Sequence, residues 1–121
     1  MTDIQLGVVE TRFADIIWQN APMSSSELVK RAGEVLGWKK STTYTVLKRL
    51  CEKGIFENVG GTVTVKMTKE AFHTLQSQRF VQETFQGSLP AFLAAFTSGK
   101  RLTEQEVAQL RKLVQQHEEG R

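Results

Sequence analysis

Residues 41–54 read STTYTVLKRLCEKG, and their spacing is typical of an amphipathic helix. At 3.6 residues per turn, one side of this helix carries Thr43, Val46, Leu47 and Leu50. The opposite side carries Ser41, Thr42, Thr45, Lys48, Arg49 and Glu52. Ser41 suits the N-cap, because its hydroxyl can accept a bond from an unpaired amide of the first turn. Gly54 suits the position after the last turn, where φ is often positive.

The polar side of this helix has an unusual composition for a surface that only meets water. Short β-branched hydroxyl residues lower helix propensity, yet they occupy the first turns and are followed by Lys48 and Arg49. Short hydroxyls beside long cations form a set that can approach base edges and phosphates together. A solvated polar face is nevertheless the commoner explanation for these residues alone, so the rest of the chain has to decide.

The charge of the chain is concentrated around this helix. The 121 residues have a formal net charge of +3 and 40% hydrophobic content, which is typical of one soluble domain or of a small domain with an appendage. Between residues 38 and 54, five positive side chains stand against one negative, a surplus of four. This local surplus exceeds that of the whole chain and favours a nucleic-acid partner.

Several classes of protein are disfavoured by the sequence. Cys51 is the only cysteine, so no internal disulfide and no thiolate cluster can form, and a half-buried thiol is expected. His73 and His117 lack partners at metal-ligand spacing, so we expect no enzyme, no metal site and no cofactor. No segment resembles a signal peptide or reaches the roughly 20 apolar residues of a membrane span. We therefore expect a cytoplasmic protein without membrane insertion.

The first 67 residues are predicted to form a winged helix-turn-helix. A helix over residues 7–19 is followed by a second one, which opens with Ser24 and Glu27 in a capping-box pattern and ends at Gly37. After the helix that begins at Ser41, the segments 55–59 and 62–67 flank Gly60-Gly61 and are predicted as a β-hairpin. In the second of these segments, Val63, Val65 and Met67 alternate with polar residues, as in a half-buried strand. Three helices followed by a hairpin is the order of a winged helix.

Residues 68–121 are predicted to form a helical dimerisation region. They hold five of the seven phenylalanines in short helices, with Ser88 as a cap and Thr103 and Glu106 as a capping box. The residues expected at the dimer interface are Phe85, Leu89, Phe92, Leu93, Phe96, Val107, Leu110 and Val114. A surface this apolar is expected to bind a partner, and a symmetric homodimer is the commonest such assembly among soluble proteins. The alternative is that this region folds back onto its own winged helix. The expected fold is thus mainly α with a small β-hairpin.

The chain resembles the penicillinase and methicillin-resistance repressors, the BlaI/MecI/CopY family. The similarity rests on ETRFADIIW (residues 10–18), SSSELVKRA (residues 24–32) and GWKKSTTYTVLKRLCEKG (residues 37–54), and it extends to the apolar helices of the tail. It implies a homodimeric repressor bound to a double-stranded DNA operator with two-fold symmetry. Thr42, Thr45 and Arg49 would then lie in the major groove.

The resemblance also implies a mechanism of release. In such repressors, a membrane sensor metalloprotease triggers a cut within the dimerisation helices, just before a phenylalanine. The matching position is Ala95–Phe96, where Ala95 replaces the usual asparagine. The hairpin lacks the arginine and the aromatic residue often found there, and the paired cysteines of the copper-responsive branch are absent.

We expect individual roles for the polar residues of the helix. Arg49 is suited to a bidentate bond with guanine, and Thr42 and Thr45 to a thymine methyl or a phosphate. The residues expected at the DNA backbone are Lys39, Lys40, Ser41, Lys48 and Lys53. Two rival interpretations remain: a ligand-sensing regulator similar to the PadR type, and a winged helix used as a protein–protein module without DNA contact. Repression rather than activation is favoured only by the resemblance.

Overall fold

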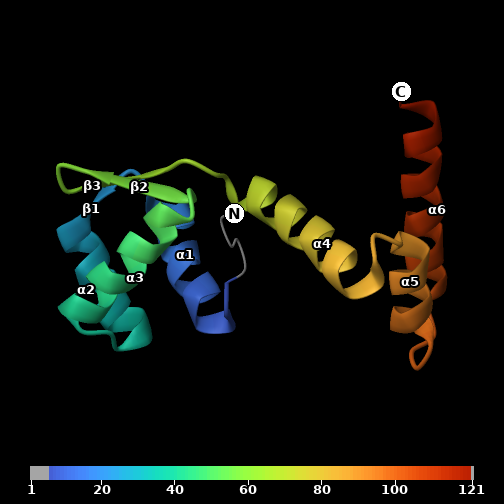
Figure 1. The fold of residues 1–121 in the computed structure, drawn as a ribbon, viewed down its shortest axis with the longest axis horizontal. Helices are drawn as coiled ribbons and strands as arrows, with labels where there is room; N and C mark the ends of the chain where they lie inside the picture. Colours follow the sequence, from blue (N-terminus) through green and yellow to red (C-terminus); the bar gives the residue numbers. More distant parts are fainter. Residues whose placement is uncertain (1–5, 121) are drawn as a thin grey trace. The chain divides into compact units, whose positions relative to one another are not determined.

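The protein consists of six helices and three short strands in the part that the structure describes, residues 6–120 (Figure 1). The structure is a computed structural model. In chain order, the elements are α1 (Val8–Asn20), β1 (Met23–Ser24), α2 (Ser25–Leu36), α3 (Lys40–Glu52), β2 (Phe56–Val59), β3 (Thr62–Val65), α4 (Lys69–Phe85), α5 (Leu89–Thr97) and α6 (Glu104–Glu119). The predicted fold class, a winged helix followed by further helices, is confirmed.

The described chain divides into two compact units, one ending at Arg79 and one beginning at Phe80. This division lies inside α4, later than the boundary that we expected after residue 67. The first turn of α4 packs against α1, because Phe72 is fully buried there and Lys69 Nζ lies 2.8 Å from Asp15 Oδ1. The start of α4 therefore belongs with the winged helix in its packing.

The sheet of the first unit is antiparallel, with the strand order β1-β3-β2. The predicted hairpin is present, and its turn uses Gly60 and Gly61 at φ values of 59° and 84°. Positive φ at both central residues is what a tight hairpin turn of this kind needs, and glycine adopts it without steric cost. The third strand, β1, was not predicted, since two residues are too few to give a sequence pattern. It pairs Met23 with Val63 and so joins the start of α2 to the hairpin.

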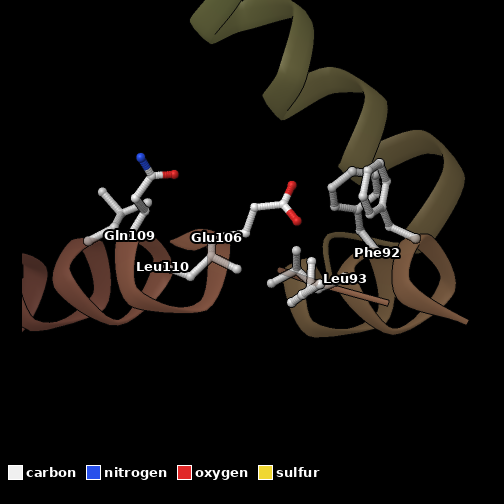
Figure 2. A pocket seen from close by; sticks show the side chains of 8 residues that line it. Phe92, Leu93, Glu106, Gln109 and Leu110 are labelled. Carbon is white, nitrogen blue, oxygen red and sulfur yellow. The ribbon is translucent and has the colours of Figure 1, made fainter. Parts of the chain in front are cut away.

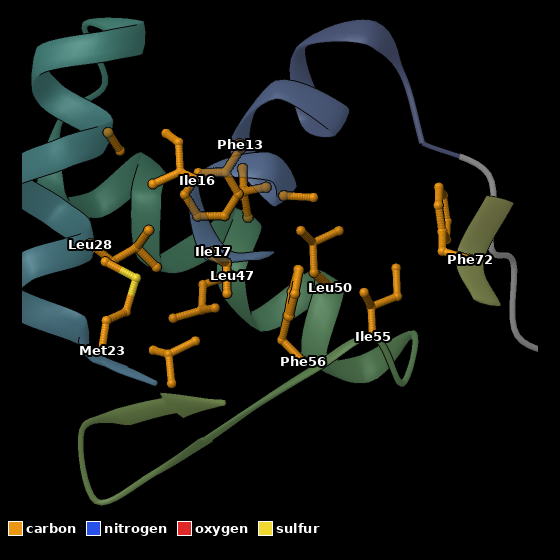
Figure 3. Packing of buried hydrophobic residues seen from close by; sticks show 14 residues of the cluster. Phe13, Ile16, Ile17, Met23, Leu28, Leu47, Leu50, Ile55, Phe56 and Phe72 are labelled. Atoms are coloured by element: carbon orange, nitrogen blue, oxygen red, sulfur yellow. The ribbon is translucent and has the colours of Figure 1, made fainter. Parts of the chain in front are cut away.

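The hydrophobic core lies between the helices and the sheet of the first unit (Figure 3). Its buried apolar members are Phe13, Ala14, Ile16, Ile17, Met23, Leu28, Ala32, Val46, Leu47, Leu50, Ile55, Phe56, Val63 and Phe72. Trp18 packs against this core, with its ring centroid 5.4 Å from Phe56 and 5.5 Å from Phe72, and its Nε1 donates to the Met67 carbonyl at 3.0 Å. The predicted alternation in β3 holds for buried Val63 but not for Val65, which is 36% exposed.

Most of the predicted helix ends are confirmed. The hydroxyl of Ser24 accepts from the Glu27 amide at 3.0 Å, and Gly37, at a φ of 70°, ends α2. The Glu27 carboxylate does not complete a capping box and instead pairs with Arg31 Nε at 3.0 Å. In the second unit, Ser88 caps α5 and Thr103 caps α6 in the predicted way.

The predicted N-cap of α3 was wrong. Lys39, not Ser41, occupies that position, with an extended backbone at φ −75° and ψ 160°. Its carbonyl accepts both the amide and the hydroxyl of Thr43, each at 3.0 Å. The helix thus begins two residues earlier than the hydroxyl pattern suggested, and Ser41 is already inside its first turn.

Candidate nucleic-acid interface

The exposed side of α3 gathers most of the predicted DNA-contact residues. Buried Val46, Leu47 and Leu50 hold the opposite side against the core, which fixes the direction in which the polar side points. The exposed predicted residues are Lys39, Lys40, Ser41, Thr42, Thr45, Lys48 and Arg49, whereas Lys53 is half-buried.

The hydroxyls of this surface differ in what they can offer a ligand. Thr45 Oγ1 donates to the Ser41 carbonyl at 2.9 Å, so its proton is engaged within the helix while its methyl group and lone pairs remain available. Within residues 6–120, the structure gives no hydrogen-bond partner to the hydroxyls of Ser41 and Thr42. These two hydroxyls are free to donate to an incoming phosphate or base edge.

The cations fall into two groups. Lys39, Lys40 and Lys48 form no ion pair with any carboxylate in the described part of the chain. Arg49 behaves differently, because its Nη1 donates to Glu10 Oε2 on α1 at 3.0 Å. Three lysines at the start and middle of α3 therefore present their charge to solvent, while the arginine charge near its end is matched within the molecule.

A groove of about 500 Å³ separates α3 from the wing, a name used here for the hairpin of β2 and β3. Two lysines line it, Lys48 on α3 and Lys66 just after β3, and cations of this kind are suited to phosphate contacts. Cys51 lines the same groove and is half-buried. Burial raises the pKa of its thiol, which favours the neutral, unreactive form.

A positioning role for three residues that hold this surface in place was not predicted from the sequence. Glu10 pairs with Arg49 across 39 positions of sequence, and the Tyr44 hydroxyl donates to Ser25 Oγ at 3.0 Å. The Ser25 amide in turn donates to the Gly61 carbonyl at 2.8 Å. No local spacing rule links residues so far apart, so these contacts had no signal in the sequence beyond the polarity of the side chains.

The second unit exposes an extensive apolar surface. None of the residues 80–120 is buried, although four phenylalanines lie in contact in the order Phe80, Phe85, Phe92 and Phe96, with centroid distances of 5.6–6.0 Å. A hollow of about 360 Å³ lies between α5 and α6. It is lined by apolar residues of both helices together with Glu106 and Gln109 of α6 (Figure 2). Leu113 and Leu102 line it but were not predicted, although Leu113 lies one turn beyond Leu110.

The predicted interface residues take part in this surface to different degrees. Phe85, Phe92, Leu93, Val107 and Leu110 are half-buried, while Leu89, Phe96 and Val114 are exposed by 55%, 52% and 59%. Leu113, which is 52% exposed, extends the same face of α6. Large apolar side chains left this open are typical of an interaction surface.

The predicted cleavage position lies within a helix. Ala95 and Phe96, the predicted cleavage position, lie inside α5, and the Ala95 carbonyl accepts from the Ser98 amide at 3.3 Å. In the described residues, no group of three or more His, Cys, Asp or Glu side chains could hold a metal ion. Among the described helices, none combines the length and apolar character that a membrane crossing requires.

Comparison with known proteins agrees with the fold. The sequence profile of the penicillinase repressor family matches residues 6–116. The chain is also similar to the penicillinase repressor of Bacillus licheniformis, with 22% identity over 117 residues that cover 93% of this chain and 91% of that protein. The family is one of transcriptional repressors and not of enzymes. The chain belongs to the penicillinase repressor family of DNA-binding transcriptional repressors.

Proposed function

We propose that this repressor binds, as a homodimer, a two-fold symmetric DNA operator, which it reads through the exposed side of α3. The observation that carries the proposal is a group of exposed cations on that side, Lys39, Lys40 and Lys48, which pair with no carboxylate among residues 6–120. Charge without an internal partner is available to neutralise phosphates and to release their counterions.

The hydroxyl residues supply the base contacts in this proposal. Thr42 and Thr45 lie one turn apart on the exposed side, and Thr45 presents its methyl group because its hydroxyl proton is already bonded. A methyl group can pack on the thymine C5-methyl, and a free hydroxyl can meet either a donor or an acceptor in the major groove. Ser41, Lys48 and the neighbouring lysines would hold the phosphates on either side.

Dimerisation through the second unit completes the operator-binding protein. One copy leaves the aromatic cluster and the α5–α6 hollow open, with no buried residue from Phe80 to Gly120. A second copy offers the same apolar surface and closes it with two-fold symmetry. Two copies of α3 about 34 Å apart would enter successive major grooves of B-DNA.

Release by proteolysis at Ala95–Phe96 is the regulatory part of the proposal. A protease needs an extended segment, so α5, which has only nine residues, must unwind locally before the bond is cut. A cut there would separate Leu89 and Phe92 from α6 and divide the apolar surface. Incubation with the cognate sensor and protease, followed by mass spectrometry of the fragments, tests this step, and an intact chain under inducing conditions contradicts it.

Selection of duplexes from a random pool tests the DNA-binding proposal. The purified protein is used at near-physiological salt and the bound duplexes are sequenced. Enrichment of an inverted repeat with half-sites about one helical turn apart supports a dimer that reads DNA. A dimer that enriches no sequence contradicts it and favours a winged helix that binds only protein.

A further inference from the structure

The ion pair between α1 and α3 uses both oxygens of one carboxylate. Glu10 Oε2 accepts from Arg49 Nη1 at 3.0 Å, while Glu10 Oε1 accepts from the Gly7 amide at 3.2 Å. The Glu10 side chain is 23% exposed, against 52% for Arg49. The carboxylate thus satisfies an amide at the start of α1 and also holds the last full turn of α3.

The electrostatic surroundings keep this carboxylate ionised. Partial burial raises its pKa, but the bonds from Gly7 and Arg49 and the charges of Lys53 and Arg49 lower it further, so the pKa of Glu10 lies below its ordinary value. Glu10 is therefore a fixed negative charge at neutral pH, and the pair persists under the conditions in which DNA is bound.

The ion pair occupies one of the two guanidinium edges with which Arg49 could read a base. A bidentate bond to guanine needs the free edge of the guanidinium, with two N–H groups directed outward from the helix. In the structure, Nη1 is bonded to Glu10 on α1, so a bidentate bond through the Nη1–Nη2 edge would require the arginine to leave Glu10. Lys48, the residue before Arg49 on α3, forms no ion pair within the described chain.

We infer that Arg49 is a positioning residue, which anchors the end of α3 on α1 through Glu10 and reads no base. The inference rests on the proposed function and refines it, because base reading is left to Thr42 and Thr45, in the first two turns of α3. It departs from the sequence-based expectation of a guanine contact. The ion pair fixes the orientation of α3 relative to α1. It therefore affects DNA affinity without contacting the DNA.

Matched variants separate an anchor from a contact. R49Q, E10Q and the E10Q/R49Q double variant are compared on the duplex that the native protein selects, with K48A as the variant of a contact residue. An anchor predicts that each single variant weakens binding roughly two- to fivefold and that the double variant is no weaker than either, as for a partly exposed ion pair. R49K retains the pair and should restore most of the affinity.

Base preference and the salt dependence of binding distinguish an anchor from a DNA contact. For an anchor, R49Q leaves the preferred sequence and the salt slope unchanged, whereas K48A lowers the slope by about one unit. A loss of preference at one base pair per half-site in R49Q but not in E10Q would overturn the inference. A salt slope that falls in R49Q as much as in K48A would also overturn the inference, because Arg49 would then contact a phosphate.

Failure of the proposed function is recognised separately. If the native protein selects no duplex, the DNA-reading proposal fails, and the anchor is then judged by urea unfolding of the native protein, E10Q, R49Q and the double variant. Coupled losses of stability in E10Q and R49Q, with no further loss in the double variant, support the anchor. Additive losses, or none, overturn it.

Discussion

The Tyr44 hydroxyl donates a hydrogen bond to Ser25 Oγ at 3.0 Å and thereby joins α3 to the first residue of α2. Ser25 is 8% exposed, and its amide donates to Gly61 at the tip of the wing at 2.8 Å. One buried serine therefore links the helix that we propose reads DNA, the helix before it and the wing. This arrangement sets the position of the wing relative to α3.

Removal of the Tyr44 hydroxyl should loosen this link. Y44F leaves the Ser25 hydroxyl without its donor, and we expect a loss of about 1 kcal/mol in the free energy of unfolding and faster hydrogen exchange in the wing. S26A, at the exposed neighbour of Ser25, is the control. Exchange in the wing of Y44F equal to that in S26A would mean that the bond does not hold the wing.

Truncation of Phe72 should destabilise the winged helix strongly. The side chain is fully buried beside Trp18, with a ring-centroid distance of 5.5 Å, so F72A leaves a cavity and costs about 3–5 kcal/mol in urea unfolding. L75A lies on the same helix with its side chain 40% exposed and should cost much less. Equal losses in the two variants would refute the packing of α4 described above.

The contribution of Glu10 to stability should depend on pH in a defined direction. Its pKa is lowered from 4.5 in the folded state, so its contribution is fully present above about pH 4.5 and disappears as the pH falls through the folded pKa. The difference in unfolding free energy between the native protein and E10Q should accordingly shrink on acidification. A difference that stays constant from pH 7 down to pH 3 contradicts the ion pair.

A charge placed in the apolar surface of the second unit should prevent dimerisation. L110E puts a carboxylate into the hollow between α5 and α6, where a buried unpaired charge is costly. Sedimentation should shift from dimer to monomer, while Q116E, on an exposed part of α6, remains dimeric. A dimeric L110E protein would place the interface elsewhere.

A contact lysine should act on all DNA sequences alike. K48A removes an unpaired charge at the groove beside the wing, so affinity for selected and unselected duplexes should fall by a similar factor. K112A, an exposed lysine of α6, is the control for net charge. A loss confined to the selected duplex would assign a base contact to Lys48 instead.

Local patterns in the sequence were sufficient to predict most of the fold. The caps at Ser24, Ser88 and Thr103 and the turn at Gly60-Gly61 depend on residues within a few positions of one another, and all were confirmed. The predicted start of α3 was wrong because the hydroxyl of Ser41 resembles that of an N-cap residue. In the structure, the carbonyl of Lys39 accepts the first helical hydrogen bond.

The positioning contacts of the site could not be predicted in the same way. Helical periodicity shows which side chains of α3 point outward, but it does not show that Glu10 engages Arg49 or that Ser25 engages Tyr44. Such pairs depend on the tertiary arrangement of α1, α2 and α3. The sequence therefore identified the exposed polar surface but not the division of its residues into contacts and anchors.

Whether the exposed side of α3 reads bases can be measured by repeating the duplex selection with T42A and T45A beside the native protein. We expect the native protein to enrich an inverted repeat and each variant to lose preference at its own position in the half-site, by at most about 1–3 kcal/mol of discrimination. Folding of both variants is checked by thermal unfolding. An identical enriched sequence for all three proteins would contradict the account, because the bases would then be read by another part of the chain.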